Sequence, residues 1–250
     1  MKFFKIIHSF LIIGFALICP KIALAQSNVI EKIQLAIPSI VEIHSKSAAM
    51  VKGPGSTFLD KITGKIVQLK GIRAVQVTKN GSGVIIDPVG VIVTNAHVVS
   101  NAGRIDVTLH DGTTVEATPL KVIPNQDLAF LKIEPPFPLT RVEIANSQAV
   151  PMGAEVITVG SSPFLKKTIS AGRITGVAKS MRQGPSEPEG LFRVNINIYH
   201  GDSGGPLFNY RGHLVGLMVA RQMEQDRFTF AIPSNTILKS YLEYLKTLKR

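Results

Sequence analysis

Cysteine is almost absent from this sequence, with Cys19 as the single one among 250 residues. No group of Cys and His residues has the spacing of a metal site, and no heptad repeat predicts a coiled coil. The net charge is +11, but the basic residues are scattered and form no dense block, which is typical of a solvated surface. We therefore expect no metal, no cofactor and no nucleic-acid partner.

An export signal opens the chain. A positively charged start, an apolar run over residues 10–18 and the small residues of Ala23-Leu24-Ala25 follow one another as in a secretory signal peptide. The pattern predicts a signal peptide over residues 1–25, with cleavage before Gln26. We expect an exported protein that makes no stable membrane insertion after cleavage.

Two other interpretations of this segment stay open. The first is an uncleaved membrane anchor, although the apolar run is short of the roughly 20 residues that span a bilayer. The second is a lipid anchor on Cys19, which the bulky preceding Ile18 disfavours. Cleavage before Gln26 removes Cys19 and three lysines, which leaves 25 basic against 17 acidic residues and a net charge of +8. The exported chain then has no disulfide, and its stability depends on its core.

One domain is expected over residues 26–250, and most of it has the pattern of strands. Short apolar runs alternate with turn signals at Asn80-Gly81, Asp87-Pro88, Asp111-Gly112 and residues 209–212, which is typical of an all-β sandwich or barrel. The runs lie at residues 74–77, 84–86, 91–93, 105–109, 128–133, 156–159, 214–219 and 228–232.

The segments between and beyond these runs are predicted differently. Residues 29–37 have the apolar spacing of a short helix that Pro38 ends, and Ser234 can cap a helix that continues to about residue 248. Residues 46–66 are predicted to form a loop or hairpin insertion, and residues 179–190 a second loop. A crossover between two halves of the domain is expected near residues 134–150.

The strongest chemical signal is the segment Gly201-Asp202-Ser203-Gly204-Gly205-Pro206. A serine hydroxyl is a weak nucleophile that needs an adjacent base and donors for the oxyanion that forms. Glycines beside Ser203 permit unusual backbone angles and leave amide groups uncovered. The segment Gly201-Asp202-Ser203 is therefore expected to form an oxyanion hole from the Gly201 and Ser203 amides, although a plain glycine-rich turn is the simpler interpretation of a shorter motif.

His97 is the best candidate for the base. It follows the strand pattern of residues 90–93, and a histidine where a strand opens into a loop can present its ring to a cleft. The other histidines beyond the predicted signal peptide are less suitable by position, because they fall at strand ends, beside the nucleophile segment or in a turn: His44, His110, His200 and His213.

Asp127 is the best candidate for the carboxylate that orients the histidine. It opens the apolar run of residues 128–133, where a carboxylate is partly buried and needs a partner. Asp111 is explained by its Asp-Gly turn, and Asp106 is expected to face solvent in an alternating strand. A simple strand start remains the alternative for Asp127.

Taken together, these motifs resemble the trypsin/chymotrypsin-like serine peptidases, and most closely their HtrA/DegP branch. The resemblance covers roughly residues 29–240. Six segments carry it: residues 81–87, 93–99, 127–133, 170–174, 201–206 and 230–234. It implies a chymotrypsin-like double six-stranded β-barrel, with Ser203, His97 and Asp127 in the crevice between the barrels. It also implies protein or peptide substrates, with a trimer as one option for the oligomeric state, and suggests the periplasm of a Gram-negative bacterium or secretion.

Two features depart from the HtrA pattern. Asp202 stands where HtrA proteins usually carry asparagine and matches the secreted trypsin-like enzymes instead. No PDZ domain follows the segment of residues 230–234, so we expect no regulation by such a domain in the same chain.

The same resemblance suggests a substrate pocket. Asn197, Ile198 and His200 would form one wall, and Leu217, Met218 and Val219 the other. Enzymes of this fold that cut after Lys or Arg have an acid six residues before the serine, where this chain has Asn197. A buried cation without a counter-charge is disfavoured. We expect cleavage after small or medium apolar residues, unless Glu187 or Glu189 supplies a charge.

Two other functions fit part of the sequence. The segment around Ser203 also fits the nucleophile elbow of α/β-hydrolases, but that fold requires the acid and then the histidine after the serine. Here His213 precedes Asp226 and no βαβ alternation is present. The second rival is a catalytically weak binding or chaperone-like module on the same fold, since fold alone does not fix function.

Overall fold

The computed structural model describes residues 29–52, 56–59, 66–69, 72–162, 165–178, 190–198, 201–219 and 229–248. The predicted signal peptide over residues 1–25 and most of the second loop, residues 179–189, lie outside the described residues. Within the described residues, no helix has both the length and the apolar character of a membrane span.

Twelve strands form two closed barrels of six strands each, and every pairing within them is antiparallel. The first barrel has the order β1 (Ile40–Lys52), β4 (Ile72–Asp87), β5 (Val91–Thr94), β8 (Leu128–Ile133), β7 (Thr114–Ile123) and β6 (Arg104–Thr108). The second has the order β10 (Leu165–Ala178), β11 (Leu191–Val194), β14 (Thr229–Pro233), β13 (Leu214–Val219), β12 (Pro206–Phe208) and β9 (Glu155–Ser162). The predicted fold class is confirmed.

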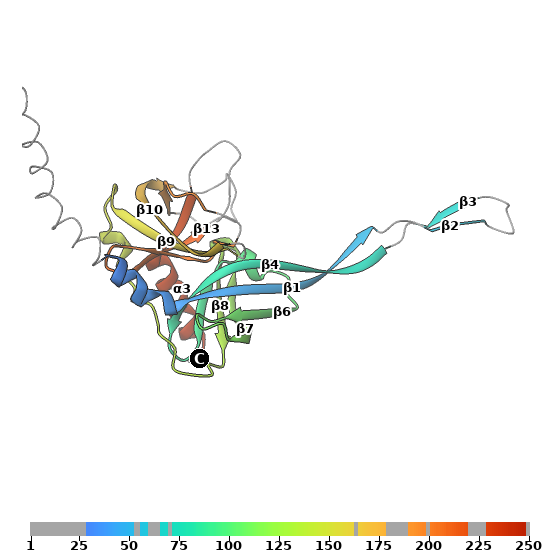
Figure 1. The fold of residues 1–250 in the computed structure, drawn as a ribbon, viewed down its shortest axis with the longest axis horizontal. Helices are drawn as coiled ribbons and strands as arrows, with labels where there is room; N and C mark the ends of the chain where they lie inside the picture. Colours follow the sequence, from blue (N-terminus) through green and yellow to red (C-terminus); the bar gives the residue numbers. More distant parts are fainter. Residues whose placement is uncertain are drawn as a thin grey trace, which may run out of the picture.

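Short helices flank and connect the barrels. Residues 29–36 are helical, and the 3-10 turn η1 (Ile37–Ser39) leads into β1, where Pro38 stops the helix as expected. The α-helix α3 (Ser234–Leu248) follows β14. The chain between β8 and β9 joins the barrels and contains the 3-10 turn η3 (Ser147–Ala149). In Figure 1, β1 and β4 extend away from the barrels as a long two-stranded ribbon, and both barrels lie at one end of it.

Hydrophobic side chains form three clusters. One fills the first barrel and includes Ile43, Ile92 and Leu131, and one fills the second barrel and includes Val156 and Met218. The third combines residues of both barrels, the N-terminal helix and α3, such as Val93, Phe130, Phe208 and Ile237. Burying one such side chain stabilises the fold by about 1.5–3 kcal/mol. This shared third cluster fixes one barrel against the other, and it explains why β5 and β13 are buried along their whole length.

The predicted turn at Asn80-Gly81 is wrong. β4 passes through both residues and pairs with β1 from Ile40↔Val84 to Lys52↔Ile72. Gly81 is needed for packing rather than for a turn, because a Cβ atom there would lie 2.6 Å from Val98 Cγ1. The predicted insertion over residues 46–66 is a hairpin in part: β1 continues to Lys52, and β2 (Ser56–Leu59) pairs with β3 (Ile66–Leu69) at the tip of the ribbon (Figure 1).

One side chain behaves differently from expectation. Asp106 was expected to face solvent, but it is buried and accepts hydrogen bonds from Lys46 Nζ and Arg104 Nε, each over 2.7 Å. These charges and hydrogen bonds hold the pKa of the Asp106 carboxyl below its usual value. Ser234 begins α3, and its hydroxyl donates to the Ala145 carbonyl in the connection between the barrels.

Candidate active site

The ends of two neighbouring strands place His97 beside Asp127. β5 pairs with β8 through Val93↔Phe130 and Thr94↔Ala129, so the residues after β5 and before β8 are neighbours. His97 lies in the short helix α2 (Ala96–Val99), and Asp127 follows the 3-10 turn η2 (Pro124–Gln126). His97 Nδ1 lies 2.8 Å from Asp127 Oδ2 and 3.0 Å from Oδ1.

Asp127 is held by its backbone as well as by its carboxylate. Its φ of 50° is left-handed, a region that aspartate tolerates better than most residues. The Asp127 carbonyl accepts hydrogen bonds from the Ala96 amide over 3.0 Å and from Asn95 Nδ2 over 3.1 Å, and its Oδ1 accepts from the His97 amide over 3.0 Å. The side chain is only 7% exposed, so these bonds satisfy a carboxylate that water barely reaches.

Ser203 completes the contact from the second barrel. His97 Nε2 lies 3.0 Å from Ser203 Oγ. A carboxylate on Nδ1 favours the tautomer with its proton on that nitrogen, so that Nε2 can accept the hydrogen bond of the Ser203 hydroxyl. The three residues predicted from sequence therefore meet in one hydrogen-bonded line, with two of them on the first barrel and one on the second.

The turn that carries Ser203 requires glycine. Gly201 has a φ of 106° and Gly204 a φ of 82°, both in the region that favours glycine. A Cβ atom on Gly204 would lie 2.2 Å from the Ser82 carbonyl oxygen and 2.4 Å from Thr94 Oγ1. The glycines allow the turn to approach the first barrel closely.

The first barrel holds this turn through Ser82, which lies in β4 and is fully buried. The Ser82 amide donates to the Ser203 carbonyl over 2.7 Å, and the Ser82 hydroxyl donates to the Gly201 carbonyl over 2.8 Å. Thr94 Oγ1 in turn donates to the Ser82 carbonyl over 2.7 Å. Ser82 and Thr94 were not predicted as site residues, although both lie in segments that carried the family resemblance.

Asp202 is also buried, and it packs against the second barrel. A Cβ atom on Gly160 would lie 2.4 Å from Asp202 Oδ1, so glycine in β9 makes room for this carboxylate. Gly160 therefore leaves room for the aspartate that stands at position 202 in place of the usual HtrA asparagine.

The residues predicted for the substrate pocket are only partly described. Asn197 is exposed and Ile198 is half-buried against the core of the second barrel, which contains Met218. Met218 adjoins the turn that carries Ser203 through its backbone: its carbonyl accepts from the Gly204 amide over 2.9 Å, and its amide donates to the Gly205 carbonyl over 2.8 Å. The side chains of Leu217, Met218 and Val219 are buried in hydrophobic clusters. His200, Glu187 and Glu189 lie outside the described residues.

Residues that typically bind metal do not gather in the described part of the chain: no group of three or more His, Cys, Asp or Glu side chains there has the arrangement of a metal site.

The chain is similar to known serine proteases. The family model for the trypsin-like peptidase domain matches residues 81–217. The serine protease HTRA4 of Mus musculus is 32% identical over 196 residues, which are 75% of this chain and 40% of that protein. The periplasmic serine endoprotease DegP of Escherichia coli is 35% identical over 161 residues, which are 63% of this chain and 34% of that protein.

A solved structure has the same fold. The HtrA-type protease AlgW with a decapeptide superposes with a TM-score of 0.69 at 24% sequence identity, over 87% of this chain and 67% of that chain. At this identity the likeness concerns the fold alone. The chain spans less than half the length of the curated relatives it matches.

Proposed function

The chain belongs to the family of trypsin-like peptidase domains, and we propose that it is a serine endopeptidase with Ser203 as nucleophile. The observation that carries this proposal is the continuous line of hydrogen bonds from Asp127 through His97 to the Ser203 hydroxyl. A serine so placed can lose its proton to the imidazole as it attacks a carbonyl carbon.

The reaction follows from these positions. His97 Nε2 takes the proton of Ser203 during attack on the scissile carbonyl and returns it to the leaving amine, which leaves an acyl group on Ser203. Asp127 keeps the imidazole in the required tautomer and stabilises the imidazolium that forms. Water then attacks the acyl group with the same assistance, which releases the second product and restores the hydroxyl.

The amides of Gly201 and Ser203, within the segment Gly201-Asp202-Ser203, are proposed to bind the oxyanion. The bonds from Ser82 to the carbonyls of Gly201 and Ser203 support this assignment, because they fix the backbone on both sides of the Asp202 residue. Donors that are already in place before the reaction stabilise developing charge without rearranging.

We propose extended or unfolded protein segments as substrates, cut after small or medium apolar residues. Asn197 brings no negative charge to the predicted pocket, and half-buried Ile198 offers an apolar wall. Apolar pockets discriminate by only about 1–3 kcal/mol per methylene, so the preference should be broad. A cleavage profile on a peptide library should show Val, Ala, Leu and Ile at the cleaved position, and a dominant Lys or Arg there would contradict this assignment.

Residues 1–25 are proposed to be a signal peptide that directs the protein to the periplasm or outside the cell. The periplasmic DegP among the relatives supports the destination. N-terminal sequencing of the exported protein tests this, since cleavage leaves Gln26 as the first residue.

The variant Ser203→Ala tests the central proposal. Turnover of a protein substrate should fall by several orders of magnitude, because the residue that forms the acyl intermediate is gone. Labelling by a fluorophosphonate probe should disappear as well, while circular dichroism stays unchanged. Proteolysis that persists undiminished in this variant would contradict the assignment of Ser203 as the nucleophile. A wild-type chain that binds unfolded protein without cutting it would favour a binding or chaperone-like role instead.

A further inference from the structure

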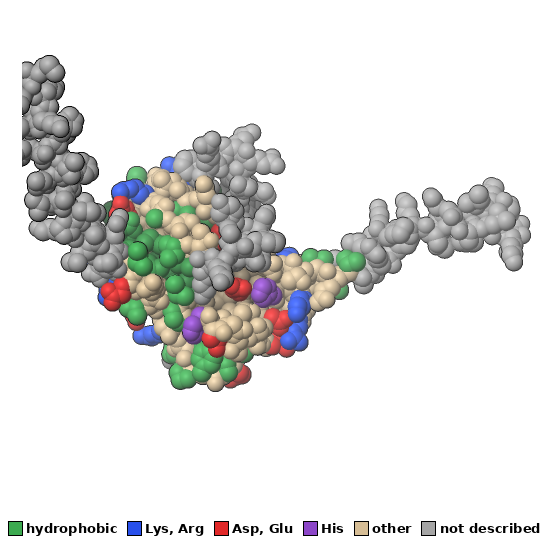
Figure 2. All heavy atoms as spheres, viewed as in Figure 1, with side chains coloured by type: hydrophobic (Ala, Val, Ile, Leu, Met, Phe, Trp, Pro, Cys, Tyr) green, Lys and Arg blue, Asp and Glu red, His purple; other side chains and the backbone are tan. Residues whose placement is uncertain are grey.

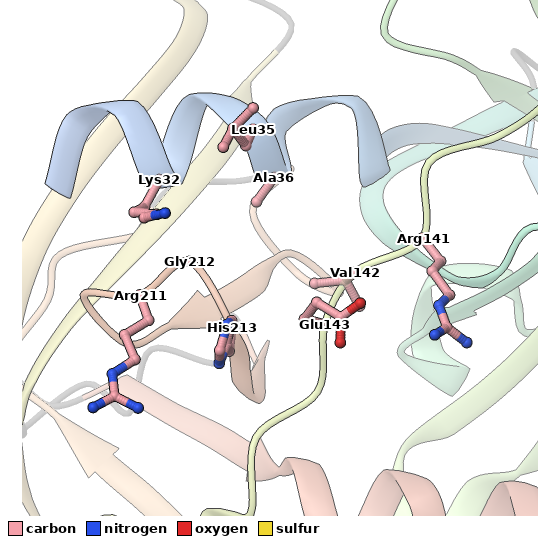
Figure 3. A pocket seen from close by; sticks show the side chains of 9 residues that line it. All are labelled: Lys32, Leu35, Ala36, Arg141, Val142, Glu143, Arg211, Gly212 and His213. Atoms are coloured by element: carbon pink, nitrogen blue, oxygen red, sulfur yellow. The ribbon is translucent and has the colours of Figure 1, made fainter. Parts of the chain in front are cut away.

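A pocket of about 480 Å³ lies where three segments of the chain meet (Figure 3). The N-terminal helix contributes Lys32 and Leu35, the connection between the barrels contributes Arg141, Val142 and Glu143, and the turn between β12 and β13 contributes Arg211. We call it the basic pocket. Its volume lies within the range of about 300–1,000 Å³ typical of ligand sites.

Backbone contacts fix all three walls of the basic pocket. The Val142 amide donates to the Ile85 carbonyl of the first barrel over 2.9 Å, and the Leu214 amide of the second barrel donates to the Glu143 carbonyl over 2.7 Å. Gly212 has a φ of 76°, and a Cβ atom there would lie 2.6 Å from the Lys32 carbonyl oxygen, so the helix rests directly on the turn. The pocket is thus formed before any ligand arrives.

The three cations of the basic pocket have no ion pair with any carboxylate that the structure describes. Lys32, Arg141 and Arg211 are exposed, and among the described residues none has a carboxylate within ion-pair distance. Some cations elsewhere on the molecule are paired: Lys46 and Arg104 contact Asp106, and Figure 2 shows basic and acidic side chains side by side near β6. Glu143 is the single acid that lines the basic pocket, so its lining carries an excess of positive charge.

We propose that the basic pocket binds an acidic peptide segment of a partner protein. Figure 3 places Lys32 and Arg211 toward one end of the pocket and Arg141 at the other, with Glu143 between them. A compact anion reaches one end only, whereas a peptide can present a carboxylate to each end. Leu35 and Val142 offer apolar contact to a side chain between those carboxylates. Such complementary charge favours association and selects against basic partners.

This site is separate from the proposed chemistry at Ser203. A peptide bound here touches the N-terminal helix, the connection between the barrels and the second barrel at once. Because a ligand that binds only the folded state stabilises it, occupancy should raise the melting temperature of the chain.

The test uses the full chain with Ser203→Ala, so that no peptide is cut. The probe is a fluorescein-labelled peptide of alternating glutamate and leucine, followed by fluorescence anisotropy, with a labelled lysine–leucine peptide as control. We expect saturable binding of the acidic peptide, weaker at higher salt because the charges are exposed. The variant Lys32→Gln/Arg141→Gln/Arg211→Gln should bind about ten-fold more weakly or worse.

A matched variant removes the same charge elsewhere. Lys121, Lys239 and Lys246 are exposed and lie outside the pocket, so Lys121→Gln/Lys239→Gln/Lys246→Gln should bind as the parent does. Equal weakening in both triple variants would overturn the proposal, because it shows general charge attraction. Absence of saturable binding, equal binding of the basic peptide, or stronger capture by phosphatidylglycerol vesicles through the same three cations would overturn it too. The readout needs no peptidase activity, so its failure is distinct from failure of the proposed function.

Discussion

At the scale of single residues, Ser82 holds the turn that carries Ser203. It is fully buried in β4, where its hydroxyl donates to the Gly201 carbonyl, its backbone amide donates to the Ser203 carbonyl, and its carbonyl accepts from Thr94 Oγ1. The bond with Thr94 lies within the first barrel, and the bonds with Gly201 and Ser203 join the first barrel to the second. The geometry around Ser203 is therefore determined partly by a residue far from it in the sequence.

The variant Ser82→Ala should lower kcat/KM by about ten-fold or more, mostly through kcat. Loss of the hydroxyl leaves the Gly201 carbonyl without its donor, and an unsatisfied buried group costs about 1–3 kcal/mol, which frees the proposed oxyanion segment to move. Steady-state kinetics on a fluorogenic peptide measure the effect.

Ser45→Ala is the matched control for this variant. Ser45 is also buried in a strand of the first barrel, but its hydroxyl has no hydrogen-bond partner among the described residues. Its removal should leave activity and melting temperature nearly unchanged. Similar losses in both variants would mean that the Ser82 hydrogen bonds contribute nothing specific.

The residues that the sequence alone could identify are those with a chemical signature. Ser203, His97 and Asp127 stand in segments whose composition already indicates nucleophile, base and buried acid, and the structure joins them by hydrogen bonds. Ser82 and Thr94 carry no such signature. Their roles arise only when β4 and β5 of one barrel meet a turn of the other, which no local pattern reveals.

At the scale of secondary-structure elements, the β1–β4 ribbon shows how a local signal can mislead. Asn80-Gly81 is a strong turn signal, yet the chain continues as a strand there because β1 pairs with it on one side. Gly83 is likewise selected for space, since a Cβ atom would lie 2.8 Å from both Ile43 Cδ1 and Ile92 Cγ2. Glycine is favoured both where a turn forms and where close packing leaves no room for a side chain. The sequence alone does not distinguish these two reasons.

The ion pairs of Asp106, where β1 pairs with β6, should make the stability of the fold depend on pH. The pKa of Asp106 is lowered by hydrogen bonds from Lys46 and Arg104. Its contribution is therefore present above the unfolded pKa of about 3.9 and is lost as the pH falls through the still lower folded pKa.

Asp106→Asn should lower the melting temperature by a few degrees at pH 7, with a difference from the parent that shrinks below about pH 4. Thermal unfolding followed by circular dichroism across this range measures it. Glu134→Gln is the control, because Glu134 is 92% exposed in its pair with Lys132 and should change little. If the difference in melting temperature between Asp106→Asn and the parent grew as the pH fell, the proposed contribution of the Asp106 carboxylate would be contradicted.

At the scale of the whole molecule, two barrels share a hydrophobic cluster and divide the site between them. That cluster includes Val93 and Phe130 from the first barrel and Phe208 and Leu214 from the second. The double barrel could be expected from the sequence because short strands alternate with turns and because six motifs come in the family's order. The shared cluster could not, since apolar runs look alike whether they face a barrel interior or a neighbouring barrel.

Reducing agents should have no effect on the stability of the chain. With one cysteine in 250 residues no intramolecular disulfide can form, so packing of the three clusters carries the fold. The melting temperature should be the same with and without dithiothreitol. A drop on reduction would indicate that the segment with Cys19 is retained and that two chains are joined through it.

Because the site is divided between the two barrels, it is complete only after both barrels have been synthesised and folded. The first barrel, with His97 and Asp127, leaves the ribosome before the turn of Ser203 and the strands β13 and β14. Since domains tend to fold in the order of synthesis, a half-made chain holds His97 and Asp127 without the Ser203 that we propose as nucleophile. The Ser82 contacts with Gly201 and Ser203 likewise exist only after the second barrel has docked. We therefore expect that an incomplete chain does not cleave other proteins, and that the proposed peptidase activity begins only when folding is complete.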